Sequence, residues 1–185
     1  MTKELEFFST GFRSILMIHR KKDGGLNRPD YHAYRKISRN SEEFFKCIKE
    51  LEILREKINP LYRIYCTVNE RDINKAIMLF KHEIIDTETY NQEDKNRFYT
   101  DIQNRFFGLL QKPVCRKTKY FMYDIDVGEE IETKDDLYKI TELIEKHTDI
   151  LKIRETQNGF HIITAPFNHT VIDLEVKKDA ITLIS

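Results

Sequence analysis

The order of strand-like and helix-like segments constrains the fold of this chain more than any other feature. Segments rich in β-branched and aromatic residues alternate with segments whose apolar residues recur at helical spacing. Strands are expected at residues 12–20, 61–68, 119–127, 150–155, 160–164 and 180–184. Helices are expected at residues 41–57, 69–80, 98–110 and 133–144, with a loop or irregular strand around Pro29, a loop at 86–96 and a short helical segment after Pro166.

This alternation predicts an α+β protein in which helices flank a mixed β-sheet. The turn Gln157-Asn158-Gly159 joins two short strands as a hairpin, so part of the sheet must be antiparallel. A length of 185 residues with 40% apolar content is enough for one domain with a proper core, which we expect to span residues 1–185. Within it we distinguish a basic α/β portion, residues 1–117, from residues 118–185.

The ends of the predicted helices carry residues that are typical of helix caps. Ser41 and Asn69 are expected to cap the helices at 41–57 and 69–80. Thr133 is expected to begin the helix at 133–144, with Asp135 and Asp136 in its first turn, where the helix dipole favours negative charge.

The charges of the chain cancel overall but are unevenly distributed. The whole sequence has 31 basic and 31 acidic residues, which argues against a general polyanion coat, because such proteins neutralise phosphates with excess Lys and Arg. Residues 1–120 carry 24 basic and 17 acidic groups, whereas residues 121–185 carry 7 and 14. This asymmetry fits either chance variation in a charge-rich chain or a basic surface facing an acidic, cation-binding one.

Several classes of protein are disfavoured by what the sequence lacks. It has no run of 18 apolar residues that could span a membrane, and its acidic start does not resemble a secretory signal. Cys47, Cys66 and Cys115 form no CxxC pair and no zinc-type cluster, so we expect free thiols in a reducing cytosol and a cytoplasmic protein.

Two carboxylates stand at the end of the apolar strand predicted at 119–127. Asp124 and Asp126, at positions i and i+2, point to the same face of a sheet because side chains alternate along a strand. Two like charges held this close favour a cation between them, and Mg²⁺ or Mn²⁺ accepts such oxygen ligands. The alternative is that Asp-x-Asp merely starts a turn into Gly128.

A second feature lies in the predicted hairpin that follows. Its turn contains Gly159, which allows the backbone to approach a phosphate closely, and His161 follows in the next strand, where its imidazole can donate to the same group. The alternative is a histidine with a purely structural place on an amphipathic strand. If the strand of Asp124 and the strand of His161 are neighbours, the carboxylates and the imidazole share one face.

Two later aspartates are candidates for a third carboxylate. Asp179 immediately precedes the last predicted strand and is the stronger candidate, whereas Asp173 fits equally well on a helix surface. A third carboxylate at a strand edge would complete a two-metal site for phosphoryl transfer.

The order of these features in residues 118–185 resembles the catalytic core of archaeo-eukaryotic primases and primase-polymerases. The resemblance implies an RRM-like fold, with Asp124 and Asp126 as catalytic metal ligands and Asp179, or else Asp173, as the third. It also implies that His161 is catalytic and that nucleotide phosphate is bound by Thr156, Asn158, Gly159 and His161. Unlike cellular primases, this chain has no zinc-binding cysteine cluster and no separate priming domain, so it looks like a minimal phage or mobile-element member.

The function expected from the resemblance is a metal-dependent nucleotidyltransferase that joins nucleotides on a nucleic-acid template. Its cofactor would be Mg²⁺ or Mn²⁺, and its partners would be nucleoside triphosphates, a DNA or RNA template and replication proteins, with no membrane. Two alternatives stay open: a metal-dependent nuclease using the same carboxylates, and a catalytically silent domain that binds nucleic acid or protein. A DxD glycosyltransferase is disfavoured, because it usually needs a larger donor-binding domain.

Basic and aromatic residues of the N-terminal portion are candidates for a groove that binds a template or a triphosphate. They are Arg13, Arg20, Lys21, Lys22, Arg28, Arg35, Lys36 and Arg39, with Tyr31 and Tyr34 for base stacking. Arg71, at the start of a predicted helix, is a candidate nucleotide contact, with a surface salt bridge as the equal alternative.

Overall fold

The computed structural model describes residues 5–19, 33–128, 131, 133–156 and 158–184. Within these residues the chain forms six α-helices and two four-stranded sheets, which confirms the α+β class. The expectation of a mixed sheet is wrong, because every strand pair of the two sheets is antiparallel. Each crossover through a helix returns the chain beside a strand of opposite direction, so no parallel pairing arises in either sheet.

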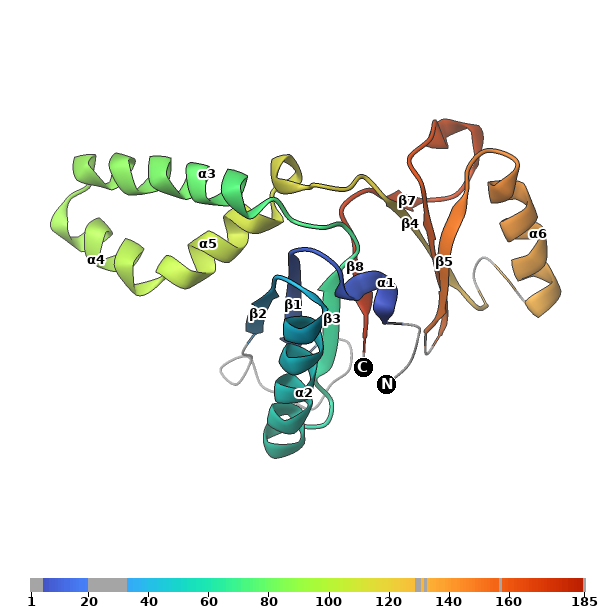
Figure 1. The fold of residues 1–185 in the computed structure, drawn as a ribbon, viewed down its shortest axis with the longest axis horizontal. Coiled ribbons are helices and arrows are strands. Elements are labelled where there is room, and N and C mark those ends of the chain that lie inside the picture. Colours follow the sequence, from blue (N-terminus) through green and yellow to red (C-terminus); the bar gives the residue numbers. More distant parts are fainter. Residues whose placement is uncertain (1–4, 20–32, 129–130, 132, 157, 185) are drawn as a thin grey trace.

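The first sheet has the strand order β2-β1-β3-β8 and combines both ends of the chain (Figure 1). Its strands are β1 (Arg13–Ile18), β2 (Tyr34–Ser38), β3 (Arg63–Thr67) and β8 (Ile181–Leu183). The last strand is therefore where the sequence predicts one, and it pairs with β3, about 115 residues earlier in the chain.

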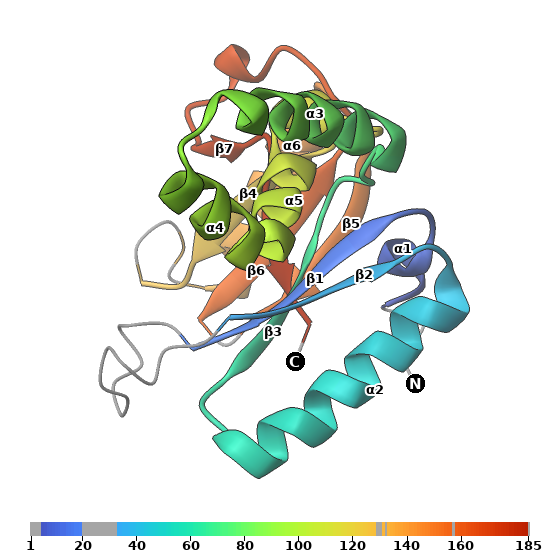
Figure 2. The same cartoon turned by 90° about the vertical axis from the view of Figure 1, so that its left-hand side faces the viewer.

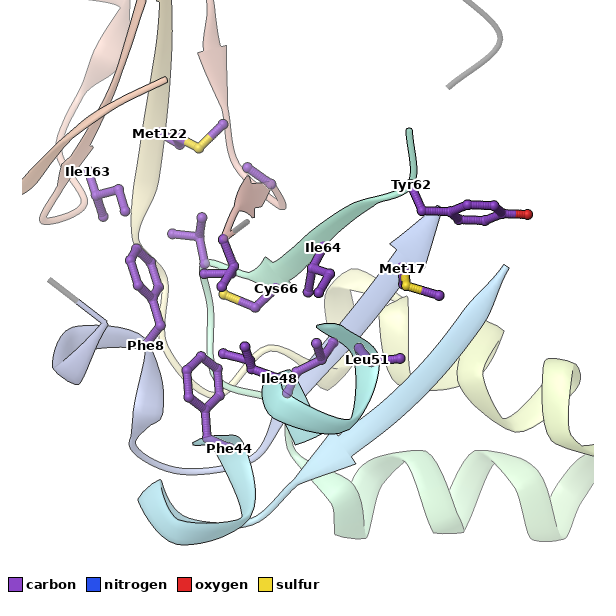
Figure 3. Packing of buried hydrophobic residues seen from close by; sticks show 14 residues of the cluster. Phe8, Met17, Phe44, Ile48, Leu51, Tyr62, Ile64, Cys66, Met122 and Ile163 are labelled. Carbon is purple, nitrogen blue, oxygen red and sulfur yellow. The ribbon is translucent and has the colours of Figure 1, made fainter. Parts of the chain in front are cut away.

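Two helices, α1 (Glu6–Ser9) and α2 (Ser41–Ile58), cover one face of the first sheet (Figure 2). The long helix α2 buries Phe44, Ile48 and Leu51, whose spacing of three or four residues places them on one side of the helix. Figure 3 shows these residues packed against β1 and β3, with Met122 and Ile163 arriving from the second sheet. One apolar core therefore joins the two sheets.

Three helices, α3 (Ile73–Asp86), α4 (Gln92–Thr100) and α5 (Ile102–Gln111), form an arm that projects from the sheets in Figure 1. A small cluster around Ala76, Leu110 and Cys115 fixes its base. A 3₁₀ turn, η3 (Thr87–Thr89), joins α3 to α4, and another, η4 (Pro113–Cys115), follows α5.

The second sheet has the strand order β5-β6-β4-β7 and is covered on one face by α6 (Lys134–Glu145). Its strands are β4 (Phe121–Asp126), β5 (Ile150–Glu155), β6 (Gly159–Thr164) and β7 (Val176–Lys177), and a short 3₁₀ turn, η5 (His169–Val171), precedes β7. The predicted hairpin at 150–164 is thus confirmed.

Alternation along β4 separates the two faces of the second sheet. Tyr123 and Ile125 are buried in the cluster under α6, whereas Met122 points the other way and joins the core of the first sheet. Asp124 and Asp126 lie two and four residues beyond Met122, on its face of the strand. The carboxylates therefore continue the face on which the two sheets meet.

The caps of the helices differ in part from the sequence prediction. Helix α2 is capped by Asn40, whose side chain accepts from the Glu43 amide at 2.9 Å, rather than by Ser41. Helix α3 is capped by Asp72 and not by Asn69, which is buried. Thr133 caps α6 as expected, in a capping box with Asp136.

The region from residue 86 to residue 101 is more helical than predicted. Helix α4 begins at Gln92, after Asn91 accepts a hydrogen bond from the Asp94 amide. Its sequence is mostly polar because it is exposed and buries chiefly Phe98, so the pattern resembled a loop. The single helix predicted at 98–110 is broken at Asp101 into α4 and α5.

The short elements α1, β7, η3 and η4 were not predicted, whereas β2 fits the irregular strand allowed for its region and η5 fits the short helical segment expected after Pro166. Among the described residues no helix is long and apolar enough to span a membrane. The three cysteines are free, as expected, and Cys66 and Cys115 are buried.

Candidate functional site

A row of polar side chains crosses the second sheet on the face that meets the first. Asp124 on β4 is paired with His161 on β6, and His161 is paired with Arg154 on β5. Residues directly opposite one another in an antiparallel pair have neighbouring side chains. The row therefore runs from Arg154 through His161 to Asp124, as expected if the strands of the carboxylate and the imidazole are neighbours.

Asp124 and His161 are in direct contact within this row. The imidazole Nε2 lies 3.0 Å from the carboxylate Oδ1 of Asp124. The His161 side chain is about nine-tenths buried, with 10% exposed, while 31% of the Asp124 side chain is exposed. The carboxylate thus lies where the buried row opens to solvent.

The other oxygen of Asp124 is bound by a lysine that the sequence did not point to. The ammonium of Lys177, on β7, lies 2.6 Å from Asp124 Oδ2. β7 pairs with β4 so that Lys177 lies opposite Met122, which places its side chain on the same face as the carboxylate. The segment has only two residues in strand conformation, too short to show a periodicity.

The second nitrogen of His161 connects the row to the first sheet. Its Nδ1 lies 2.8 Å from the hydroxyl of Thr182, which is fully buried on β8. A neutral ring that donates from Nε2 to Asp124 accepts from the Thr182 hydroxyl at Nδ1, so both ring nitrogens are satisfied. Nearby, Arg154 donates to the carbonyl of Ile184 at 2.7 Å. The strand β8 is therefore held by side chains of the second sheet.

The ionisation of the row follows from burial and neighbouring charges. Burial, the largest influence, lowers the pKa of His161 below its ordinary value, with help from Lys177 and Arg154 and against the attraction of Asp124. For Asp124 burial raises the pKa, but the hydrogen bond and the charge of Lys177, together with His161, which is protonated at the acidic pH where Asp124 titrates, outweigh it, so the pKa is lowered. At neutral pH we therefore assign a neutral imidazole and an Asp124 carboxylate held ionised chiefly by Lys177.

The glycine of the predicted phosphate-binding turn has a steric reason to be a glycine. Gly159 lies opposite Asp126, and a Cβ added to it would overlap the carbonyl oxygen of Ile125, between the two aspartates. Only a residue without a side chain lets β6 approach β4 this closely. Gly159 therefore sets the distance between the strands that carry His161 and Asp124.

The other hairpin residues lie next to the end of β4. The Val127 amide donates to the Asn158 carbonyl at 2.8 Å, and the Thr156 amide donates to the Gly159 carbonyl at 2.8 Å. Asn158 is exposed and Thr156 is half-buried, while Gln157 lies outside the described residues. The turn thus closes over the end of β4 that carries Asp126.

Asp179 and Arg71 are paired with each other. The two guanidinium nitrogens of Arg71 lie 2.5 and 3.3 Å from the two carboxylate oxygens of Asp179. Only 1% of the Arg71 side chain is exposed, so the guanidinium does not face solvent as the proposed nucleotide contact would require. The salt-bridge alternative therefore describes the observed state of Arg71. Asp173, the weaker candidate for a third carboxylate, is exposed between η5 and β7 and lies in no helix.

Asp124 and Asp126 fit a simpler metal site than the expected site with three carboxylates. Asp124 and Asp126 offer two carboxylates on one strand face, and Mg²⁺ is commonly held by one or two carboxylates together with substrate phosphates. Asp179 is engaged by Arg71, and the described residues contain no group of three or more His, Cys, Asp or Glu arranged to hold a metal. Lys177 is the cation that binds Asp124 in this structure. The geometry thus fits a metal held by Asp124 and Asp126, and it does not fit a three-aspartate cradle.

The basic candidates of the N-terminal portion that the structure describes are engaged by other groups of the chain. Arg13 is only 1% exposed, and its guanidinium donates to backbone carbonyls that include that of Val68 at 2.5 Å. Arg35 donates to Asn104, Lys36 pairs with Glu50, and Arg39 pairs with Glu43. Tyr34 packs edge-on against Tyr62, with ring centroids 6.0 Å apart. The remaining candidates, Arg20, Lys21, Lys22, Arg28 and Tyr31, lie outside the described residues.

A buried asparagine holds the ends of the two sheets together and was missed as a structural residue. The amide nitrogen of Asn69 donates to the carbonyls of Tyr120 and Lys178, at 3.0 and 3.2 Å. Its oxygen accepts from the Tyr120 amide at 2.6 Å and from the Thr118 hydroxyl at 3.0 Å. Asn69 therefore fixes the segments that enter β4 and leave β7, which carry Asp124 and Lys177.

Comparisons with known proteins leave this geometry to be interpreted on its own. No protein-family model, curated protein or solved structure matches the chain.

Proposed function

We propose that this chain is a metal-dependent nucleotidyltransferase of the primase-polymerase type, built on an RRM-like second sheet. The observation that carries the proposal is the contact between Asp124 and His161 at 3.0 Å, made by residues 37 positions apart on neighbouring strands. The same strand face carries Asp126, and the glycine turn closes beside it. This combination of carboxylates, imidazole and accessible turn suits the binding of a metal–triphosphate complex.

In this proposal the residues of the row, Asp126 and the hairpin turn have separate roles. Asp124 and Asp126 hold Mg²⁺ or Mn²⁺, which when bound supplies electrophilic activation and charge neutralisation at the reacting phosphate. His161, held by Thr182 at Nδ1 and bonded to Asp124 through Nε2, orients the Asp124 carboxylate toward the metal. Arg154 adds positive charge at the far end of the row. The backbone of the turn at Asn158 and Gly159, with the Thr156 side chain, binds phosphate oxygens next to Asp126.

Metal-dependent nucleotide binding is the first test. Calorimetry with a nucleoside triphosphate, in Mn²⁺ and in EDTA, compares the wild type with D124N/D126N and with E93Q, which removes an exposed carboxylate on α4 in the arm. We expect binding that requires Mn²⁺ in the wild type and in E93Q, and a loss of at least about tenfold in the double variant. Equal triphosphate affinity with and without Mn²⁺ would contradict the proposal.

A catalytically silent nucleic-acid-binding domain is the second candidate. It is favoured by the pairing of Asp124 with Lys177 and of Asp179 with Arg71, since each of these carboxylates already has a cationic partner. A labelled primer on a template, incubated with triphosphates and Mn²⁺, separates the candidates. Primer extension that is lost in D124N/D126N supports the enzyme, primer shortening supports the nuclease alternative, and binding without either reaction supports the silent domain.

A further inference from the structure

Lys177 occupies the position at which Asp124 would contact a cation. Its ammonium lies 2.6 Å from Oδ2, while the other oxygen, Oδ1, faces the His161 imidazole at 3.0 Å. Both carboxylate oxygens of Asp124 therefore have a partner in this structure. Asp124 cannot offer Oδ2 to a divalent ion while the ammonium of Lys177 remains there.

The contact is built so that it can be exchanged. The Lys177 side chain is 42% exposed, and an ammonium on a four-carbon stem is a mobile point charge rather than a rigid fork. A partly exposed ion pair of this kind contributes little to stability, so its exchange costs little. Once it leaves Oδ2, the ammonium stays anchored on β7, on the same sheet face as His161 and Arg154, where an anion is its natural partner.

We propose that Lys177 couples the binding of the divalent metal to the binding of a phosphate anion. The metal alone binds weakly, because Asp124 must first give up the ammonium. A phosphate group at the same face accepts the released ammonium and so lowers the cost of freeing Asp124. The inference rests on the metal site of the proposed function, and it adds to that function a reason for the metal and the phosphate to bind together.

This coupling is reciprocal by linkage. If phosphate tightens metal binding by some factor, the metal must tighten phosphate binding by the same factor. Removing the ammonium while keeping the length of the side chain, as in K177M, abolishes the coupling. The variant frees Asp124 permanently, so it binds the metal more tightly in the absence of phosphate and gains little when phosphate is added.

The test measures metal binding directly, without any reaction. Free Mn²⁺ is followed by electron paramagnetic resonance while the full chain is titrated, with and without inorganic phosphate, against protein-free standards. The variants are K177M, K177R and the matched control K178M, which removes the same charge from the next residue, exposed and in contact with neither aspartate in the described structure. Circular dichroism and urea unfolding verify that each variant is folded.

We expect K177M to bind Mn²⁺ about tenfold more tightly than the wild type without phosphate, a typical size for coupling between sites. Phosphate should tighten binding several-fold in the wild type, K177R and K178M, and little in K177M. Equal, measurable affinities of wild type and K177M overturn the coupling while the metal site stands. If K178M binds Mn²⁺ more tightly to the same extent as K177M, the effect comes from the lower net positive charge, and the proposed coupling is overturned. No Mn²⁺ binding by any variant overturns the proposed function together with this inference.

Discussion

Lys177 and Asp179 lie two residues apart, and each makes an ion pair, but the two pairs differ in burial and in the number of contacts. Asp179 receives two guanidinium contacts from Arg71, at 2.5 and 3.3 Å, and the arginine is 1% exposed. Lys177 makes one contact to Asp124, at 2.6 Å, with 42% of the lysine and 31% of the aspartate exposed. We call the buried Arg71–Asp179 pair the closed pair and the partly exposed Lys177–Asp124 pair the open pair.

The difference shows that the partner of a carboxylate determines what the carboxylate can do. Arginine presents a planar fork that fits both oxygens of a carboxylate, and its burial makes separation costly. Lysine neutralises charge at one point and exchanges with water or other cations easily. Asp179 is thereby committed to holding β8 and the helical arm together, and Asp124 remains available for a ligand.

The largest expected effect is the loss of the closed pair. Replacing Arg71 by Met leaves the Asp179 carboxylate without its buried partner, and we expect the free energy of unfolding to fall by about 3 kcal/mol, the lower end for breaking a buried pair, because 21% of Asp179 stays exposed. Urea unfolding measures this. D179N, which leaves the more buried guanidinium without a counter-ion, should lose at least as much, and a loss below about 1 kcal/mol in R71M would remove the distinction between the pairs.

The next effect concerns the strand spacing on which the open pair depends. G159A places a Cβ against the Ile125 carbonyl, so β6 must move away from β4, and we expect a loss of about 2 kcal/mol, as for other overpacked sites. The Asp124–His161 contact should weaken with it, whereas the Arg71–Asp179 pair lies outside this sheet and should persist. Gly108 in α5 is the control, because a Cβ there meets nothing within 4 Å. Equal losses in G159A and G108A would contradict the steric argument.

The part of this arrangement that sequence reasoning could predict is the part set by local pattern. Alternation along 119–127 placed both carboxylates on one face, and the glycine turn identified a hairpin. The adjacency of the strands of Asp124 and His161 was only a condition of the sequence argument, and the pairing of β4 with β6 meets it. The strand at 180–184 was also predicted, since the stretch Ile181-Thr182-Leu183-Ile184 is rich in β-forming residues.

What could not be predicted depends on contacts between distant segments. Nothing in residues 180–184 indicates that β8 pairs with β3 in the other sheet, which is what brings Thr182 to His161. Asn69 resembles a helix cap in sequence, but its buried amide is satisfied by backbone groups about 50 and 110 residues away. Asp179 satisfied the pattern of a metal ligand, and its pairing with Arg71 is decided by the packing of the arm.

Loss of the open pair should cost the fold little. We expect K177M to change the free energy of unfolding by less than about 1 kcal/mol, because the lysine side chain is 42% exposed and makes a single, exchangeable contact. Urea unfolding of K177M beside R71M makes the comparison direct, and K178M again serves as the matched control. A loss in K177M as large as that in R71M would make the Asp124 pair a structural one and would remove its availability for a ligand.

The smallest effect is a shift in the pKa of His161, and its sign depends on which partner of the Lys177–Asp124 pair is replaced. The native pKa of His161 is lowered, so the unfolded chain, with a histidine pKa of about 6.5, binds more protons just below that pH. This contribution to stability is therefore fully present above about pH 6.5 and is lost as the pH falls through the window down to the native pKa.

Because the charge of Lys177 lowers the pKa of His161, K177M should raise this pKa. D124N removes the opposing attraction of Asp124 and should lower the pKa further. R71M should leave it unchanged, since Arg71 does not contribute to the shift. Nuclear magnetic resonance of the imidazole protons across pH 4–8 measures each value. A pKa that moves with R71M as much as with K177M would mean that the two ion pairs act on the site together and that the open pair has no separate role.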